Sequence, residues 1–379
     1  MTFLEIIRNS ATNLPLKYTG SFRENIRKKI LSFGEIIDNS EDLSESINDI
    51  SFKSDIFKRR NKILRTGILD AIDAYYEGDP VRAYQLLSTS LKDSNLNGYL
   101  NKEMVLEEGS NLFRLRVINQ NYPLSKEDLF HIPFDKRSLV STQRFSISGL
   151  PSLYLANSIY VAWEEMKRPS MNEVQVVRIV NNHSMNMLDL TTDIFSRNTH
   201  LIDNLSYGWQ LLYKVMVWPL IAACSVRVQN PNDPFKPEYI IPQLLLQWVN
   251  KHKVFGIKYS STYIDLDTSK HEGSFYNIVV PVRTFNREKG HCPELLKSFN
   301  STQVVPFQIR QIATITDRLS HQESIRSNIN KDITGLELIK GYVQPYASTI
   351  FGVMEHNLNG IKTESFKIKR SNTSTTAGV

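Results

Sequence analysis

The chain changes its hydrophobic pattern near residue 100. Before that point, apolar residues recur every three or four positions, which predicts helices over Phe3 to Ile7, Phe22 to Ile37 and Asp55 to Tyr76. A fourth helix is predicted after Asp79-Pro80, because aspartate accepts the free amide hydrogens and proline presets the helical φ. We therefore expect a helical domain over residues 1–100.

From Leu112 onward, short strand patterns alternate with helical ones, which indicates a mixed domain over residues 101–365 and an α+β fold class. Strands are predicted at Leu112 to Ile118, Ser152 to Ala156, Val174 to Val180, Phe255 to Tyr259 and Asn277 to Val282. Helices are predicted from Ser158, from Tyr207 to Cys224 with an interruption at Trp218-Pro219, from Pro237 to Val249, and from Tyr346 to Leu358. An amphipathic segment spans Ile309 to Ile325, and the polar residues 366–379 are expected to be disordered.

Composition and charge narrow the function classes. The 45 basic and 39 acidic residues give a net charge of +6 without a long basic block, so we expect no nucleic-acid partner, although a basic cleft for a phosphorylated small molecule remains open. The most apolar segment is too short to span a membrane, and no signal peptide is seen. With Cys224 and Cys292 as its two cysteines, the chain is expected in a reducing cytoplasm without a metal site.

The stretch from Arg144 to Glu165 carries the first candidate chemistry. It places a cation, the Gly149 to Pro151 turn and two carboxylates within about twenty residues, which suits a ligand with a phosphate at one end and a sugar at the other. Glu164 and Glu165 differ by about 100° around their helix, so we expect one in a cleft and the other at the surface.

Other candidates remain ambiguous from the sequence. Alternation sends Arg114 and Arg116 to one face of their strand, as a solvated surface or as the lining of an anion site. His131 lies between apolar neighbours, so a buried, hydrogen-bonded histidine is favoured over a ligand contact or base. Ser260, Ser261 and Thr262 stand at the end of a strand, where hydroxyls serve in turns or in active sites.

The order of these features resembles the RES domain, over about residues 112–282. An F-R-x-R strand is followed by R-F-S-x-x-G-x-P-x-x-Y, a helix ending in glutamate and a strand ending in serine. The family's G-R-W-N-x-x-G-x-P-x-x-Y segment precedes a glutamate eleven residues past its tyrosine, which selects Glu165. It aligns Arg144 with the motif arginine and Phe145 with the tryptophan, while Gln143 and Ser146 depart from the glycine and asparagine.

The resemblance implies further site residues. The first family arginine would be Arg114, with Arg116 as the alternative. The family's Pro-Ser pair aligns Ser261 with the functional serine, but the missing proline leaves Ser260 open. The implied catalytic residues are thus Arg114, Glu165 and Ser261, and the implied substrate-binding residues are Arg144, Tyr154 and Arg116.

The resemblance also implies an ADP-ribosyltransferase-like fold. It further implies that the chain is the toxin of a toxin-antitoxin pair and that it cleaves NAD. The ADP-ribosyl group would pass to water in hydrolysis, to inorganic phosphate in phosphorolysis, or to a protein in ADP-ribosylation. NAD is then the substrate, and no cofactor or metal is required. Bond cleavage develops positive charge on the ribose, which a carboxylate such as Glu165 would stabilise. The cognate antitoxin is expected to cover the cleft or to hold the protein in an inactive homo-oligomer. The alternative is a non-catalytic interaction protein.

The helical segment would correspond to an N-terminal domain related to HEPN ribonucleases. Their chemistry needs an arginine followed closely by a histidine, and no histidine precedes His131. We therefore expect this segment to be a scaffold or a partner-binding module.

Overall fold

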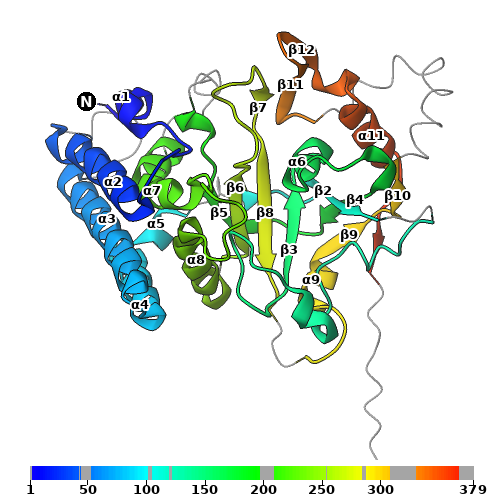
Figure 1. Ribbon diagram of the computed structural model, residues 1–379, viewed down its shortest axis with the longest axis horizontal. Helices are drawn as coiled ribbons and strands as arrows, with labels where there is room; N and C mark the ends of the chain where they lie inside the picture. Colours follow the sequence, from blue (N-terminus) through cyan, green and yellow to red (C-terminus); the bar gives the residue numbers. More distant parts are fainter. Residues whose placement is uncertain are drawn as a thin grey trace, which may run out of the picture.

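The computed structural model describes residues 2–41, 43, 53–100, 105–118, 122–196, 209–252, 254–283, 287–307 and 330–366. Helices α1 to α5 form one end of the molecule, a large curled sheet forms the middle, and α6 and α11 lie towards the other end (Figure 1). This arrangement confirms the α+β class and the helical N-terminal region.

The N-terminal helices follow the predicted pattern closely. In α2, the residues Ile26, Ile30 and Phe33 are fully buried at helical spacing. Asp79 accepts a hydrogen bond from Arg82 N at 2.9 Å and so caps α4, with proline in its first turn, as predicted. The bounds are α1 (Phe3–Arg8), α2 (Phe22–Asn39), α3 (Ser54–Tyr76), α4 (Pro80–Asp93) and α5 (Leu96–Tyr99).

In the described part of the chain, ten strands form the large sheet, in the order β1-β5-β6-β8-β3-β2-β4-β9-β13, with β10 paired to β4. All of its pairings are antiparallel except that of β5 with β6. The strands β2 and β3 pair only at Phe113 and Ala156, so they separate beyond that point. The bounds are β1 (Val105–Leu106), β2 (Asn111–Val117), β3 (Ser152–Ala156), β4 (Val174–Asn181), β5 (Met185–Leu190), β6 (Gly256–Ser260), β8 (Tyr276–Pro281), β9 (Phe299–Ser301), β10 (Val305–Pro306) and β13 (Glu364–Ser365).

A smaller sheet, in the order β12-β11-β7, lies beside the large one (Figure 1). It consists of β7 (Glu272–Gly273), β11 (Ile333–Ile339) and β12 (Tyr342–Pro345). The remaining α-helices are α6 (Ile159–Glu165), α7 (Trp209–Ser225), α8 (Ile240–Lys251), α9 (Pro293–Ser298) and α11 (Ile350–Asn359).

The predicted interruption at Trp218-Pro219 is wrong, because α7 continues through Pro219. Proline removes the N–H that would bond the carbonyl four residues earlier, which is that of Val215. The buried side chain of Asn61, from α3, places its amide against the carbonyls of Val215 and Met216, at 3.5 and 3.1 Å. A partner from another helix thus replaces the lost backbone bond.

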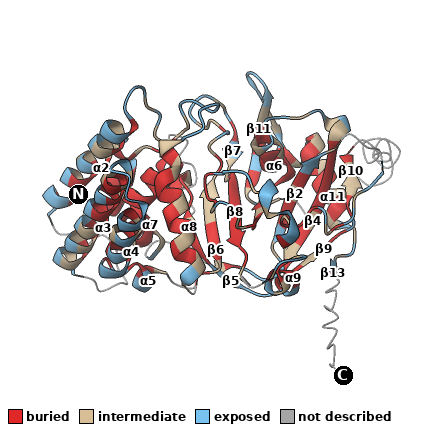
Figure 2. Cartoon of the chain, turned by 60° about the horizontal axis from the view of Figure 1, so that its bottom comes forward, coloured by how far each residue is buried: buried red, intermediate tan, exposed pale blue. Residues whose placement is uncertain are grey.

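The N-terminal helices share one hydrophobic cluster with α7, α8 and part of the sheet. Phe33 stacks on Trp218 of α7 with ring centroids 4.1 Å apart, and the cluster extends to Leu188, Ile257 and Val279 of the sheet. The buried sides of α2, α3, α7 and α8 can be followed in Figure 2. The proposed division near residue 100 stays a prediction, and the packing across it is continuous.

Two of the predicted segments lie outside the described residues, namely the amphipathic segment at 309–325 and the tail beyond residue 366. In the part of the chain that the structure describes, no helix combines the length and apolar character needed to cross a bilayer.

Candidate active site

A carboxylate at the end of a short helix is the centre of the candidate site. The helix α6 is capped by Ser158, which accepts a hydrogen bond from Val161 N at 3.0 Å, and it ends at Glu165. Glu165 Oε1 accepts hydrogen bonds from Ser261 Oγ at 2.6 Å and from Asn277 Nδ2 at 2.8 Å. Ser261 follows β6 and Asn277 lies in β8, so three elements far apart in sequence meet at one oxygen atom.

The second oxygen of Glu165 is free to face a ligand. Among the described residues, Oε2 has no hydrogen-bond partner, and the residue is only partly buried. Burial raises the pKa of Glu165, whereas the hydrogen bonds from Ser261 and Asn277 and the charge of Arg144 lower it. The hydrogen bonds and Arg144 thus favour the ionised form of Glu165 and partly offset the cost of its desolvation, while the net shift of its pKa is upward.

Arg144 is the cation of this site. It is only 8% exposed, and its guanidinium donates to the carbonyl of Cys224 at 3.1 Å and to Thr262 Oγ1 at 3.2 Å. The guanidinium also lies over the ring of Tyr239, 5.3 Å from the centroid. These contacts come from the end of α7, the turn after β6 and the short helix η8 (Pro237–Tyr239), and they fix the arginine in place.

Tyr154 supports the segment that carries Arg144. Its hydroxyl donates to the carbonyl of Phe145 at 2.6 Å, and Phe145 packs against Tyr259 with centroids 4.6 Å apart. Burial raises the pKa of Tyr154, while Arg114 opposes the rise. The predicted role of Tyr154 as a contact to NAD remains a prediction, and its hydroxyl is already engaged with the backbone.

Among the described residues, neither Arg114 nor Arg116 forms a hydrogen bond or an ion pair with Glu165. Arg114 donates to the carbonyl of Tyr154 at 3.0 Å, where β2 and β3 separate, and burial, assisted by Arg116, lowers its pKa to about 10. Arg116 is exposed and donates to the carbonyl of Asp128 at 2.7 Å. Arg114 thus holds the strand behind Tyr154, and the catalytic role predicted for it stays a prediction.

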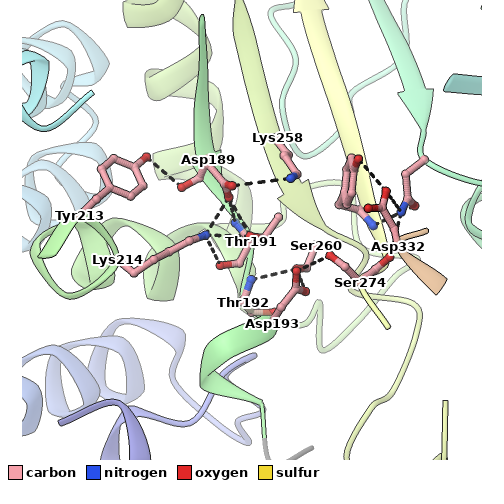
Figure 3. A network of polar contacts seen from close by, with 12 residues as sticks. Asp189, Thr191, Thr192, Asp193, Tyr213, Lys214, Lys258, Ser260, Ser274 and Asp332 are labelled. Atoms are coloured by element: carbon pink, nitrogen blue, oxygen red, sulfur yellow. Dashed lines mark hydrogen bonds and ion pairs between the residues drawn. The ribbon is translucent and has the colours of Figure 1, made fainter. Parts of the chain in front are cut away.

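The geometry separates the two serines that the sequence left open. Ser260 Oγ accepts from Thr192 N at 2.9 Å and donates to Asp193 Oδ1 at 3.2 Å, within the network of Figure 3. Ser261 Oγ instead donates to Glu165. Because successive residues of an extended chain face opposite ways, Ser261 belongs to the candidate site and Ser260 to the supporting network.

Behind Ser260, a buried ion pair joins α7 to the sheet (Figure 3). Lys214 Nζ lies 2.8 Å from Asp189 Oδ1 and also donates to Thr191, and Lys258 lies 3.7 Å from Asp189 Oδ2. Burial by itself would raise the pKa of Asp189, but the two lysines hold it well below its usual range. This network fixes the end of β5 beside β6, and sequence reasoning missed it.

Asn277 and Tyr239 also escaped the sequence reasoning, whereas Thr262 was considered there as one of the three hydroxyl residues at the end of a strand. Only Asn277 had a signal that could have identified it, because it is a polar residue at the start of the otherwise apolar run NIVVPV and is 5% exposed. Thr262 stands in an ordinary turn sequence. Tyr239 precedes an apolar helix, where an aromatic residue is typical of a core.

The expectation that Glu164 lies at the surface is wrong. Glu164 is 3% exposed, and its Oε2 accepts from Arg168 Nε at 2.9 Å. The short helix turns this side chain inward against Tyr160, whose pKa is raised by burial and by Glu164. His131 is buried as expected, with Nε2 accepting from Cys292 N at 2.8 Å.

Within the described ranges, no group of three His, Cys, Asp or Glu residues is arranged to hold a metal ion.

Comparison with known proteins gives one informative relative. The chain is 31% identical over 344 residues to the Bacillus subtilis (strain 168) protein named "Putative toxin YopC", with 83% of this chain and 71% of that protein covered. No protein-family model matches the chain. No solved structure matches it either.

Proposed function

Because the chain belongs to the family of this Bacillus subtilis protein, we propose that it is a toxin that consumes NAD by cleaving the bond between nicotinamide and ribose. The observation that carries the proposal is the Glu165 carboxylate, with Oε1 held by two donors and Oε2 free. The resemblance to the RES domain, whose pattern selects the same glutamate, supports it.

The chemistry asks little of the protein beyond charge and orientation. Nicotinamide leaves NAD as a neutral molecule when the C–N bond breaks, and positive charge then develops on the ribose. A fixed carboxylate oxygen beside that ribose stabilises the oxocarbenium-like state, and its orientation requires no rearrangement during the reaction. Glu165 Oε2 would supply this charge, while Ser261 and Asn277 hold the carboxylate in place.

Arg144 would bind the pyrophosphate of NAD. Two of the five N–H groups of its guanidinium are engaged by Cys224 and Thr262, which leaves donors for phosphate oxygens. Tyr239 lies under the guanidinium, with its ring centroid 5.3 Å from Arg144 Cζ. The acceptor of the ADP-ribosyl group would be water, inorganic phosphate or a protein side chain.

The proposal is tested by incubating the purified chain with NAD and identifying the products by chromatography. We expect free nicotinamide, with ADP-ribose in plain buffer and a phosphorylated ADP-ribose when phosphate is the acceptor. Radiolabelled NAD would reveal transfer to protein. A chain that leaves NAD intact under all three conditions would instead be assigned to the non-catalytic interaction proteins.

A toxin that removes NAD must be restrained in the cell that makes it. We therefore propose a cognate antitoxin protein as partner, and co-expression with the neighbouring gene product is the direct test. Rescue of growth by that product, together with loss of nicotinamide release in the mixed proteins, is the expected result.

A further inference from the structure

A hollow of about 250 Å³ lies where the start of α2, the end of α3 and the segment before α8 meet. It is distinct from the Glu165 site, but both contain residues of the helix η8. Pro237 and Glu238 line the hollow, whereas Tyr239 lies under Arg144. Aromatic and acidic residues make up much of its lining, among them Tyr18, Phe22, Tyr76, Asp233, Phe235 and Glu238.

Aromatic rings form much of this lining. Phe235 is 52% exposed and Tyr76 is 43% exposed, which is high for such large apolar side chains. Phe235 stacks on Tyr75 and meets Tyr76 edge to face, with centroids 6.3 Å apart in both pairs. Clustered aromatic rings around a hollow attract cations through their quadrupoles.

A buried carboxylate lies among these rings. Glu238 is 2% exposed, and its Oε1 accepts from Tyr18 Oη at 2.7 Å and from Gln229 N at 2.9 Å. Its Oε2 is shielded from solvent and has no hydrogen-bond partner among the described residues. A buried carboxylate oxygen without a donor is costly, so this atom is placed to receive a charged donor from outside.

Among the described residues, no lysine or arginine pairs with this carboxylate. The lining holds a second acid, Asp233, and no lysine or arginine. Arg23 lies over the ring of Tyr76 but is paired with Asp73 at 2.6 Å. Lys236 donates to the backbone carbonyl of Asp233 at 2.6 Å. In a protein with a net charge of +6, a hollow with two acids and no lining cation favours a positive ligand.

We propose that this hollow binds an organic cation, an alkylammonium or guanidinium group, through the Glu238 carboxylate and the surrounding aromatic rings. Such a group belongs to small amines and guanidines and also to the lysine and arginine side chains of another protein. The hollow lies next to the Arg144 side chain, because Glu238 is directly followed by Tyr239, whose ring lies under the Arg144 guanidinium. The proposal does not depend on NAD cleavage.

The test is a ligand-observed NMR titration of the full chain at low salt. Methylguanidinium and butylammonium are expected to bind saturably, whereas N-methylurea, the neutral counterpart of methylguanidinium, is not. Glu238→Gln keeps a carbonyl oxygen for Tyr18 and Gln229 but loses the charge, and it should weaken cation binding by about tenfold or more. Glu288→Gln, at an exposed position, is the matched control and should bind as the wild type does.

A second variant guards against a general loss of structure. Phe235→Leu removes a half-exposed ring but keeps an apolar side chain, so the fold should persist while binding weakens about twofold to fivefold. Tripeptide amides with a central arginine or lysine separate the two sources: binding at least tenfold tighter than the free cation points to a protein side chain, and equal or weaker binding points to a small molecule. The proposal is overturned if no cation binds saturably, if N-methylurea binds equally well, or if Glu238→Gln leaves binding unchanged.

Discussion

The substitution Glu165→Gln separates the charge of the candidate site from its shape. The glutamine carbonyl can still accept the hydrogen bonds from Ser261 and Asn277 that Oε1 accepts in the wild type. What disappears is the negative charge at the free oxygen. Removing one fixed electrostatic group of this kind typically lowers kcat by about 10²–10³-fold, or ~2.7–4 kcal/mol of transition-state stabilisation.

Stability should move in the opposite direction from activity. Since burial raises the pKa of Glu165, the folded state holds the proton more tightly than the unfolded state does, and the ionised carboxylate costs stability at neutral pH. The neutral glutamine removes that cost. We therefore expect a Tm equal to or above that of the wild type, together with the loss of nicotinamide release.

The assay is initial-rate nicotinamide release at saturating NAD, with thermal unfolding of the same preparations. Glu164→Gln is the matched control, because Glu164 is the adjacent carboxylate and pairs with the mostly exposed Arg168. It should keep kcat within about threefold, and thermal unfolding of the same variant reports the effect of losing the ion pair with Arg168 on stability. A folded Glu165→Gln variant that retains a third or more of the wild-type kcat would refute the reasoning.

Three further predictions concern the supporting contacts. Ser261→Ala should lower kcat by about tenfold to a hundredfold, because it removes a hydrogen bond to a charged group. Ser260→Ala should chiefly lower Tm. Equal effects of the two substitutions on kcat in steady-state assays would contradict the assignment of Ser261 to the site. Glu355 of α11 is buried and accepts a hydrogen bond from Ile159 N, at the start of α6, at 2.7 Å. Burial raises the pKa of Glu355 to about 8, so its contribution to stability is present at low pH and is lost as pH rises from about 4.5 to about 8. The Tm of Glu355→Gln should therefore rise relative to that of the wild type across this window, and a constant difference between the two Tm values would count against the prediction. Asp189→Asn leaves Lys214 buried without its counter-charge, so the free energy of unfolding measured in urea titrations should fall by about 3–5 kcal/mol. A loss under ~1 kcal/mol would show that the Lys214–Asp189 ion pair is dispensable.

Most of the local structure could be predicted because it depends on neighbours in sequence. The apolar spacing of α2, the Asp79 cap and the Ser158 cap are all set within one or two helical turns. The continuity of α7 could not be predicted, because the donor that compensates for Pro219 is Asn61, about 150 residues away. Helix propensity alone therefore gave the wrong answer at that residue.

The candidate site likewise combines residues that local sequence signals predict with residues that they do not. Glu165 was selected by its spacing from Tyr154, which is a local signal carried by a family pattern. Asn277 and Thr262 act through distances of about a hundred residues in sequence, and single positions of this kind carry no periodicity to detect. The choice between Ser260 and Ser261 depended on which face each hydroxyl takes, and only the bonds of each serine could decide it.

The N-terminal helices gain a structural role from these contacts. Arg144 is held by the carbonyl of Cys224 at the end of α7, and α7 is in turn held by Asn61 and Phe33 of the N-terminal helices. Because close-packed cores transmit displacement rather than absorb it, a shift of α3 against α7 would move the carbonyl that positions the arginine. If the chain binds NAD through Arg144 as proposed, a partner bound to the outer helices would weaken that binding without touching Glu165. This is a physical route by which the proposed antitoxin would act.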